Sequence, residues 1–244
     1  MTPTAATGPL AGTIALVTGA SRGIGAAVAE RFAAEGAHVV AAARTVGGLE
    51  EVDDRIRARG GSTTLVPLDL RDFIKIDELA ARLYERYGRL DILVGNAGEF
   101  GAFSPLGHID PTLWGEVIEL NLTANWRLIR AMDPLLRAAP EGRAIFVTSR
   151  LGRDAPPYYG PYAVAKAGLE TLVRIYAGEI ARTRVRANLI DPGSVRTRLR
   201  ARIFPGENPA ALSSPQTVAG TFLELALPDC TRNGEIITIT PQSS

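Results

Sequence analysis

A tyrosine and a lysine stand four residues apart in a segment with helix-like composition. Tyr162 and Lys166 belong to the largely apolar run 161–168, and Ser149 ends the strand-like run Ala-Ile-Phe-Val-Thr-Ser further upstream. Side chains at i and i+4 share one face of a helix, so a phenol and an ammonium group could act on one substrate atom. The spacing indicates a proton donor with a tuned pKa.

The chemistry of these groups explains why the combination is useful. A tyrosine hydroxyl has a pKa of about 10, but a nearby cation favours the phenolate and lowers that pKa towards neutrality. Lys166 is the cation within reach, and the hydroxyl of Ser149 could hold a carbonyl oxygen against Tyr162 while charge develops on it. Since Tyr-x-x-x-Lys also occurs by chance in amphipathic helices, the assignment needs supporting motifs.

A glycine-rich loop near the start of the chain supplies the first of these. Residues 13–18 have the composition of a buried strand, and residues 26–35 have a helical pattern. A strand, a glycine turn and a helix form a cradle for a pyrophosphate, because glycine lets the backbone approach and the helix start offers free N–H groups. The spacing is Gly-x-x-x-Gly-x-Gly rather than the common Gly-x-Gly-x-x-Gly. The predicted cradle residues are Gly19, Ser21, Arg22, Gly23, Ile24 and Gly25.

Further motifs follow in a fixed order along almost the whole chain. They are Asp69-Leu70, Asn96-Ala97-Gly98, Asn121, Ser149, Tyr162 with Lys166, and Pro192-Gly193 leading through Val195 to Thr197. Together with the glycine loop, these motifs resemble those of the short-chain dehydrogenases/reductases, of the compact single-domain kind that includes 3-oxoacyl-carrier-protein reductases. Each motif alone is of modest specificity, whereas their order and spacing together are highly specific.

The resemblance implies roles for several of these residues. Asp69 and Leu70 would border an adenine pocket, and Asn96, Ala97 and Gly98 would close the fourth strand beside the cofactor. Asn121 would kink its helix and hold a water that links Lys166 to solvent. Pro192, Gly193, Val195 and Thr197 would pass beside a nicotinamide. Gly95 stands where the family has a first asparagine, a departure that we expect to loosen one local hydrogen bond.

Composition is compatible with one enzyme domain. A chain of 244 residues with 46% hydrophobic residues can bury one sizeable core. A net charge of +1 provides no overall attraction to nucleic acid or anionic membranes, and the apolar runs are too short to span a bilayer. We predict a flexible arm over 1–12, which lacks the features of a signal peptide, and one domain over 13–244.

Cysteine and histidine usage argues against other site types. Cys230 is the single cysteine, so no intrachain disulfide can form, and His38 and His108 lack the spacing of metal ligands. We therefore expect no metal site, and a reducing cytoplasm as the location.

Apolar runs alternate with amphipathic segments throughout the chain. This pattern predicts an α/β fold with a doubly wound, parallel, seven-stranded sheet of the Rossmann type. Ligands of such sheets bind at the carboxyl ends of the strands, where the motifs fall. The predicted strands are 13–18, 37–43, 63–68, 90–95, 143–148, 185–190 and 235–240.

The end of the second predicted strand informs the choice of dinucleotide. A carboxylate there would bind the adenosine ribose hydroxyls and repel a 2′-phosphate, but the strand ends Ala43-Arg44 without one. Arg44, with Arg22 of the glycine loop, could bind a 2′-phosphate. We predict NADP(H) as the favoured cofactor and keep NAD(H) as possible.

The hypothesis that follows is an oxidoreductase that transfers hydride between nicotinamide and a carbonyl or secondary alcohol. Tyr162 serves as general acid/base, Ser149 steadies the oxygen, and Lys166 with Asn121 passes a replacement proton. Two alternatives stay open: a cofactor-binding regulator without turnover, and an epimerase or dehydratase on the same scaffold.

The substrate and the assembly are less defined. Residues 194–214 are predicted to form a substrate lid, whose four arginines leave open an acyl-carrier-linked or carboxylated substrate. The segment Pro156-Pro157-Tyr158-Tyr159 is expected to shape the pocket wall. By resemblance, helices around 110–136 and 159–182 would pair across subunits in a homodimer or homotetramer. The terminal strand lacks the usual Asp-Gly-Gly, which puts such contacts in doubt.

Overall fold

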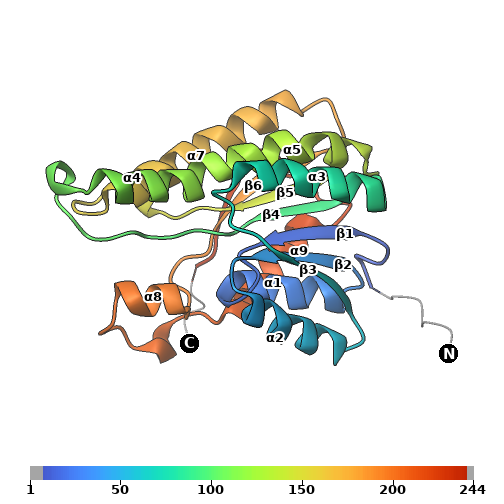
Figure 1. Ribbon diagram of the computed structural model, residues 1–244, viewed down its shortest axis with the longest axis horizontal. Helices are drawn as coiled ribbons and strands as arrows, with labels where there is room; N and C mark the ends of the chain where they lie inside the picture. Colours follow the sequence, from blue (N-terminus) through green and yellow to red (C-terminus); the bar gives the residue numbers. More distant parts are fainter. Residues whose placement is uncertain (1–7, 241–244) are drawn as a thin grey trace.

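The computed structural model describes residues 8–240, which form a parallel sheet with helices on both faces (Figure 1). The strand order is β3-β2-β1-β4-β5-β6-β7, and every pairing is parallel. The strands are β1 (Ile14–Thr18), β2 (His38–Ala43), β3 (Ser62–Pro67), β4 (Ile92–Gly95), β5 (Arg143–Val147), β6 (Arg186–Asp191) and β7 (Ile236–Thr238). The predicted fold class is confirmed, and every predicted strand overlaps an observed one.

Helices cover the sheet in two layers. One layer contains α1 (Gly23–Ala34), α2 (Val46–Arg57) and α9 (Pro215–Ala226); the other contains α3 (Phe73–Tyr87), α4 (Pro111–Ile118), α5 (Ala124–Ala138) and α7 (Gly160–Glu179) (Figure 1). Two hydrophobic clusters correspond to these layers. The central strands β1, β4 and β5 are mostly apolar because both of their faces are covered.

The predicted helix over 110–136 is interrupted at its middle. α4 is capped by Asp110, whose carboxylate accepts from the N–H groups of Thr112 and Leu113 at 2.9 and 3.0 Å. A π-helical turn over Glu119–Thr123 then separates α4 from α5. Such turns insert an extra residue and are frequent at functional sites. This turn contains Asn121, where a kink was expected.

The lid segment contains regular structure. The short helix α6 (Leu151–Asp154) follows Ser149, and α8 (Arg198–Ile203) and a 3-10 turn (Pro209–Ala211) occupy the lid range 194–214. The backbone of Val195 forms a parallel bridge with Ser213, and Arg196 N donates to Ser213 O at 2.9 Å. The lid is therefore a closed loop tied at its base.

The prediction of a flexible arm over 1–12 is wrong for residues 8–12, and residues 1–7 lie outside the described part. Leu10 is fully buried in the core, and its N–H donates to Glu35 O at 2.9 Å. This turn packs against the end of α1 because Leu10 fills an apolar space there.

Among residues 8–240, no helix has the length and apolar character needed to cross a membrane.

Candidate active site

A cleft of about 270 Å³ opens at the carboxyl ends of the strands. It brings together nearly all the residues predicted from the sequence. Those lining it are Gly19, Ser21, Arg22, Gly23, Ile24, Arg44, Asp69, Leu70, Asn96, Ala97, Gly98, Ser149, Tyr162, Lys166, Pro192, Gly193, Val195 and Thr197. Gly25 and Asn121 are the two that do not line it.

The glycine loop leaves backbone space at the start of α1. Gly19 and Gly23 have positive φ values of 65° and 58°, which favour glycine. A Cβ on Gly25 would meet Asn96 Nδ2 at 2.5 Å, so Gly25 packs beneath the loop instead of facing the cleft. Asn96 Nδ2 donates to Thr18 O at 2.8 Å and holds the end of β1. The free N–H groups of the helix start can donate hydrogen bonds to a pyrophosphate, so the loop fits a dinucleotide.

Charged side chains gather around the end of β2. Arg44 Nη1 lies 3.9 Å from Asp69 Oδ2, while Arg71 holds the same carboxylate at 2.9 Å and thereby lowers the pKa of Asp69. Arg71 carries most of the interaction with Asp69, and the side chain of Arg44 remains 47% exposed. Arg44 and Arg22 can therefore both approach a phosphate at this end of the cleft.

Tyr162 is half-buried beside the buried Lys166, and its pKa does not follow the prediction from the sequence. Burial raises the pKa of Tyr162 to about 12, and hydrogen bonding to Ser149 acts in the opposite direction. Lys166 Nζ lies 5.5 Å from the centre of the phenol ring. The predicted lowering of the tyrosine pKa is wrong, because loss of hydration on burial outweighs the lowering influence of the hydrogen bond with Ser149.

The group whose pKa moves towards neutrality is the lysine. Burial lowers the pKa of Lys166 from 10.5 to about 8, against the raising influence of the Glu170 carboxylate. Its Nζ donates to the carbonyl oxygen of Val147 at 2.8 Å. An amine with a pKa near 8 exchanges protons readily at neutral pH, so Lys166 is suited to proton relay.

Asn121 approaches the same point from the π-helical turn. Its Nδ2 donates to Glu99 O and Val117 O at 2.8 and 2.9 Å, while its Oδ1 is buried without a partner among the described residues. A Cβ on Gly98 would lie 2.7 Å from that oxygen and 3.7 Å from Lys166 Nζ. An unpaired buried acceptor beside an amine is suited to a bridging water.

An ion-pair network that was not predicted from the sequence lies behind these residues. Arg153 of α6 pairs with both Glu170 of α7 and Asp191 of β6, whose carboxylates are almost fully buried. Thr148 Oγ1 also donates to Glu170 Oε1 at 2.8 Å. One guanidinium thus joins the three segments that carry the predicted serine, the predicted lysine and the Pro192-Gly193 turn.

The departure at Gly95 has a steric explanation. A Cβ there would collide with the ring of Phe146 and would lie 2.5 Å from Asn125 Oδ1. Asn125 Nδ2 donates to Asn121 O at 2.8 Å. Neighbouring side chains thus fill the space that an asparagine would need, and the expected loosening of a hydrogen bond stays a prediction.

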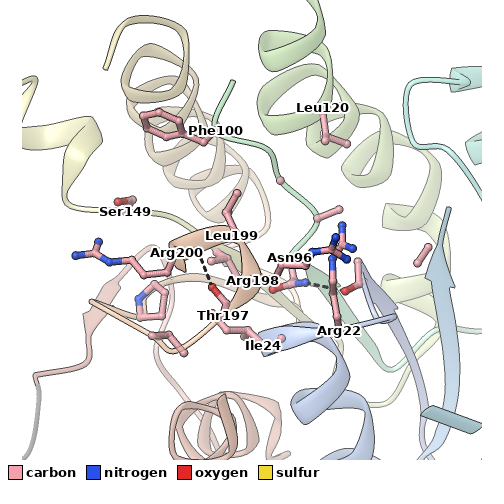
Figure 2. A pocket seen from close by; sticks show the side chains of 18 of the residues that line it. Arg22, Ile24, Asn96, Phe100, Leu120, Ser149, Thr197, Arg198, Leu199 and Arg200 are labelled. Atoms are coloured by element: carbon pink, nitrogen blue, oxygen red, sulfur yellow. Dashed lines mark hydrogen bonds between the residues drawn. The ribbon is translucent and has the colours of Figure 1, made fainter. Parts of the chain in front are cut away.

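The end of the cleft beside Ser149 is lined by apolar residues that the sequence analysis mostly missed. In Figure 2, Phe100 and Ser149 lie on one side of the lid residue Leu199, and Arg22 and Asn96 lie on the other. The only sequence signal for Phe100 was its place after the fourth strand. Missed lining residues include Phe100, Leu120, Leu151, Leu199 and Ile203. No cluster of metal-ligating side chains occurs within residues 8–240.

Comparisons with known proteins agree with this geometry. The family model for short chain dehydrogenases matches residues 13–208. The oxidoreductase YciK of Escherichia coli is 35% identical over 90% of this chain and 88% of its own length. The 3-oxoacyl-[acyl-carrier-protein] reductase FabG of the same species is 35% identical over 88% of this chain and 90% of its own length.

Solved structures show the same relationship. A short chain dehydrogenase from Pseudomonas syringae has a TM-score of 0.91 and 37% identity, covering 98% of both chains. One from Escherichia coli CFT073, complexed with NADPH, has a TM-score of 0.88 and 33% identity over 97% of this chain and 99% of its own. Carveol dehydrogenase from Mycobacterium avium, in complex with NAD, has a TM-score of 0.87 and 27% identity over 96% and 98%. This chain therefore belongs to the short chain dehydrogenase family of oxidoreductases.

Proposed function

We propose that this protein is an NADP(H)-dependent oxidoreductase that interconverts a carbonyl compound and a secondary alcohol, with Tyr162 as general acid/base. The observation that carries the proposal is one cleft lined by both the glycine loop at the start of α1 and the group Ser149, Tyr162 and Lys166. When bound, the reduced nicotinamide supplies hydride to the carbonyl carbon.

The chain's own residues then manage the proton and the developing charge. Tyr162 is a neutral phenol at pH 7, since its pKa is about 12, so it can donate its hydroxyl proton to the substrate oxygen. Ser149 Oγ orients that oxygen. Lys166 Nζ, with a pKa of about 8, can replace the phenol proton from solvent through a water held by Asn121 Oδ1. The catalytic set is thus Asn121, Ser149, Tyr162 and Lys166.

The preference for NADP(H) rests on charge. Arg22 and Arg44 line the cleft near the end of β2, where no carboxylate ends the strand. Similar proteins have been crystallised with NADPH, and one with NAD, which keeps NAD(H) possible. The remaining predicted cofactor contacts are those of the glycine loop, Asp69 and Leu70, the segment 96–98 and the segment 192–197.

The test is oxidation of NADPH, and separately of NADH, with a panel of ketones. Net NADPH consumption with at least one ketone supports the proposal. Binding of NADPH without consumption across the panel would favour a cofactor-binding regulator. Conversion of a sugar or hydroxy compound without net cofactor consumption would favour an epimerase or dehydratase.

A homodimer or homotetramer and a cytoplasmic location belong to the same proposal. Trp126 of α5 and Ile175 of α7 are exposed large apolar side chains that line one shallow groove. Helices α5 and α7 would pair there across subunits. Light scattering of the purified protein tests this, and a monomer at micromolar concentration would exclude it.

A further inference from the structure

We propose that the substrate is an uncharged ketone with an aromatic ring next to its carbonyl group, or the corresponding alcohol. This inference rests on the proposed function, because it assigns a substrate class to the Tyr162 site. Its basis is a set of four rings at the Ser149 end of the cleft, which we call the aromatic wall: Phe100, Phe103, Tyr159 and Phe204.

The aromatic wall continues directly from the catalytic phenol. The Phe100 ring centre lies 5.4 Å from that of Tyr162, 4.8 Å from that of Phe103 and 5.6 Å from that of Tyr159. Phe103 meets Tyr159 edge-on at 5.0 Å and Phe204 at 6.2 Å. Phe100 and Phe204 themselves line the cleft. Three of these five ring pairs are edge-to-face and two are tilted, and all five separations lie in the range that aromatic pairs prefer, so a substrate ring would find matching partners beside Tyr162.

Part of the aromatic wall lies next to a turn with strained backbone. Tyr158 has a φ of 74° and Ala155 a φ of 45°, which non-glycine residues rarely adopt. The carbonyl oxygen of Tyr158 accepts from Ser104 N at 3.2 Å, which joins this turn to the loop that carries Phe103. The next residue, Tyr159, thereby presents its ring to Phe103. Strained residues persist where the surrounding structure over-determines them, often at ligand sites.

Charge near the wall argues against a carboxylated or acyl-carrier-linked substrate. Arg200 donates from Nε and Nη2 to the Glu207 carboxylate at 2.6 and 2.7 Å, and its guanidinium lies 4.0 Å from the Phe204 ring centre. Arg202 pairs with Glu99 at 3.6 Å. Figure 2 shows that Arg200 extends on the side of Ser149. Because Arg200 pairs with Glu207, the positive charge nearest the aromatic wall is already neutralised. An incoming carboxylate would lose hydration without gaining a free cation.

The other cleft-lining arginine of the lid belongs to the cofactor end. Arg198 follows Thr197, and a Cβ on Gly23 of the glycine loop would lie 3.3 Å from Thr197 Cγ2. The start of α8 therefore sits over the predicted phosphate cradle. This position gives Arg198 no part in selecting the substrate ring.

The experiment compares matched ketones with NADPH. Acetophenone is the aryl ketone, 2-butanone lacks the ring, 4-acetylbenzoate adds a carboxylate to the same ring, and a 3-oxoacyl N-acetylcysteamine thioester represents acyl-carrier substrates. We expect kcat/KM for acetophenone to exceed that for each of the other three at least tenfold. A preference for 4-acetylbenzoate or for the thioester would overturn the inference while leaving the proposed function intact. Turnover of none of the four with either NADPH or NADH would overturn the inference, and the wider ketone panel would then decide the proposed function.

Variants of the wall give a second readout. Phe204→Ala should lower kcat/KM for acetophenone about tenfold, mainly through KM, because it removes ring contacts and not a reacting group. Phe100→Leu should act in the same direction. Both should lower kcat/KM for 2-butanone by a smaller factor than kcat/KM for acetophenone. Tyr84→Ala, at an exposed tyrosine of α3 outside the cleft, is the matched control and should leave both ketones unaffected.

Equal losses for acetophenone and 2-butanone in both wall variants would contradict the inference, since they would indicate general damage to the site. Unchanged kcat/KM for acetophenone in both variants would contradict it as well. A circular dichroism melt of each variant shows that it is folded before the kinetics are compared.

Discussion

Polar side chains at the two ends of the strands differ in how completely they are hydrogen-bonded. At the amino ends, Asp91 accepts from Ile14 N at 2.8 Å and from Arg89, and His38 has both ring nitrogens bonded to hydroxyl groups at 2.9 Å. Arg143, which is 1% exposed, donates to the carbonyl oxygens of Gly142, Arg184 and Leu227 at 2.9 to 3.2 Å. Each of these groups is held by hydrogen bonds within the protein.

At the carboxyl ends, buried polar groups keep some capacity unused. Asn121 Oδ1 has no partner among the described residues, and burial raises the pKa of Tyr162 to about 12 and lowers the pKa of Lys166 to about 8. Holding such groups out of water costs stability, and it leaves them able to exchange protons. The comparison teaches that polar burial stabilises one end of the sheet and prepares the other for chemistry.

The strongest test of this contrast is Tyr162→Phe. Because the phenol proton is the one donated to the substrate oxygen, kcat should fall about 10²- to 10⁴-fold. The Kd for NADPH, measured by fluorescence titration, should change less than about twofold, since the phenyl ring keeps its packing. A fall in kcat of less than about tenfold would argue against the general acid/base role.

Arg143→Met should damage stability and spare catalysis. The variant leaves several buried carbonyl groups unpaired, so the free energy of unfolding should fall by about 2–4 kcal/mol in urea titrations. KM and kcat of the folded fraction should stay near those of the parent protein. Arg130→Met, at an exposed arginine of α5 that lies 4.0 Å from Asp77, is the control and should cost less than about 0.5 kcal/mol. If both variants lower the free energy of unfolding by the same amount, the hydrogen bonds of Arg143 contribute little to stability.

Lys166→Met should abolish most turnover and yet raise stability at pH 7. Lys166 has a pKa of about 8 in the folded protein, against 10.5 in the unfolded chain. Between these pH values the folded state binds fewer protons than the unfolded state. The free energy of unfolding of the wild-type protein therefore increases as pH rises from about 8 to 10.5. At pH 7 the buried charge of Lys166 lowers the free energy of unfolding by up to about 3 kcal/mol, and the neutral methionine removes this cost. Urea titrations at pH 7 and pH 10 should show the variant's advantage shrinking. A variant less stable than wild type at pH 7 would contradict the burial cost.

The smallest expected effect concerns the cofactor end of the cleft. Arg44→Ser should raise the Kd for NADPH about tenfold, because the 2′-phosphate of NADPH loses one charged hydrogen-bond donor. The Kd for NADH, which has no 2′-phosphate, should change less than about twofold. Fluorescence titration with each dinucleotide measures both constants. Arg57→Ser on α2, where the arginine pairs with Asp53 away from the cleft, is the control. Equal weakening for both dinucleotides would show that Arg44 does not select the phosphate.

Local pattern was enough to predict the elements and most of the cleft. Continuous apolar runs such as Ile92–Gly95 become strands because a parallel sheet is covered on both faces, and motifs after such runs meet at one edge. The pKa of Tyr162 was predicted in the wrong direction. The spacing of Lys166 from Tyr162 is visible in the sequence, but the burial that raises the pKa of Tyr162 is a property of the packed layers.

The sequence by itself determined the order of strands and helices, the glycine loop and the i, i+4 spacing of Tyr162 and Lys166, because each depends on residues close together in the chain. Only the tertiary structure decided the contacts of Arg153 with Glu170 and Asp191, and of Phe103 with Phe204. Those partners lie far apart in sequence, so their meeting depends on how the sheet orders its strands and on where the lid closes. The physical reason is that short-range propensity acts within a segment, whereas desolvation and pairing depend on what other segments bring to the same place.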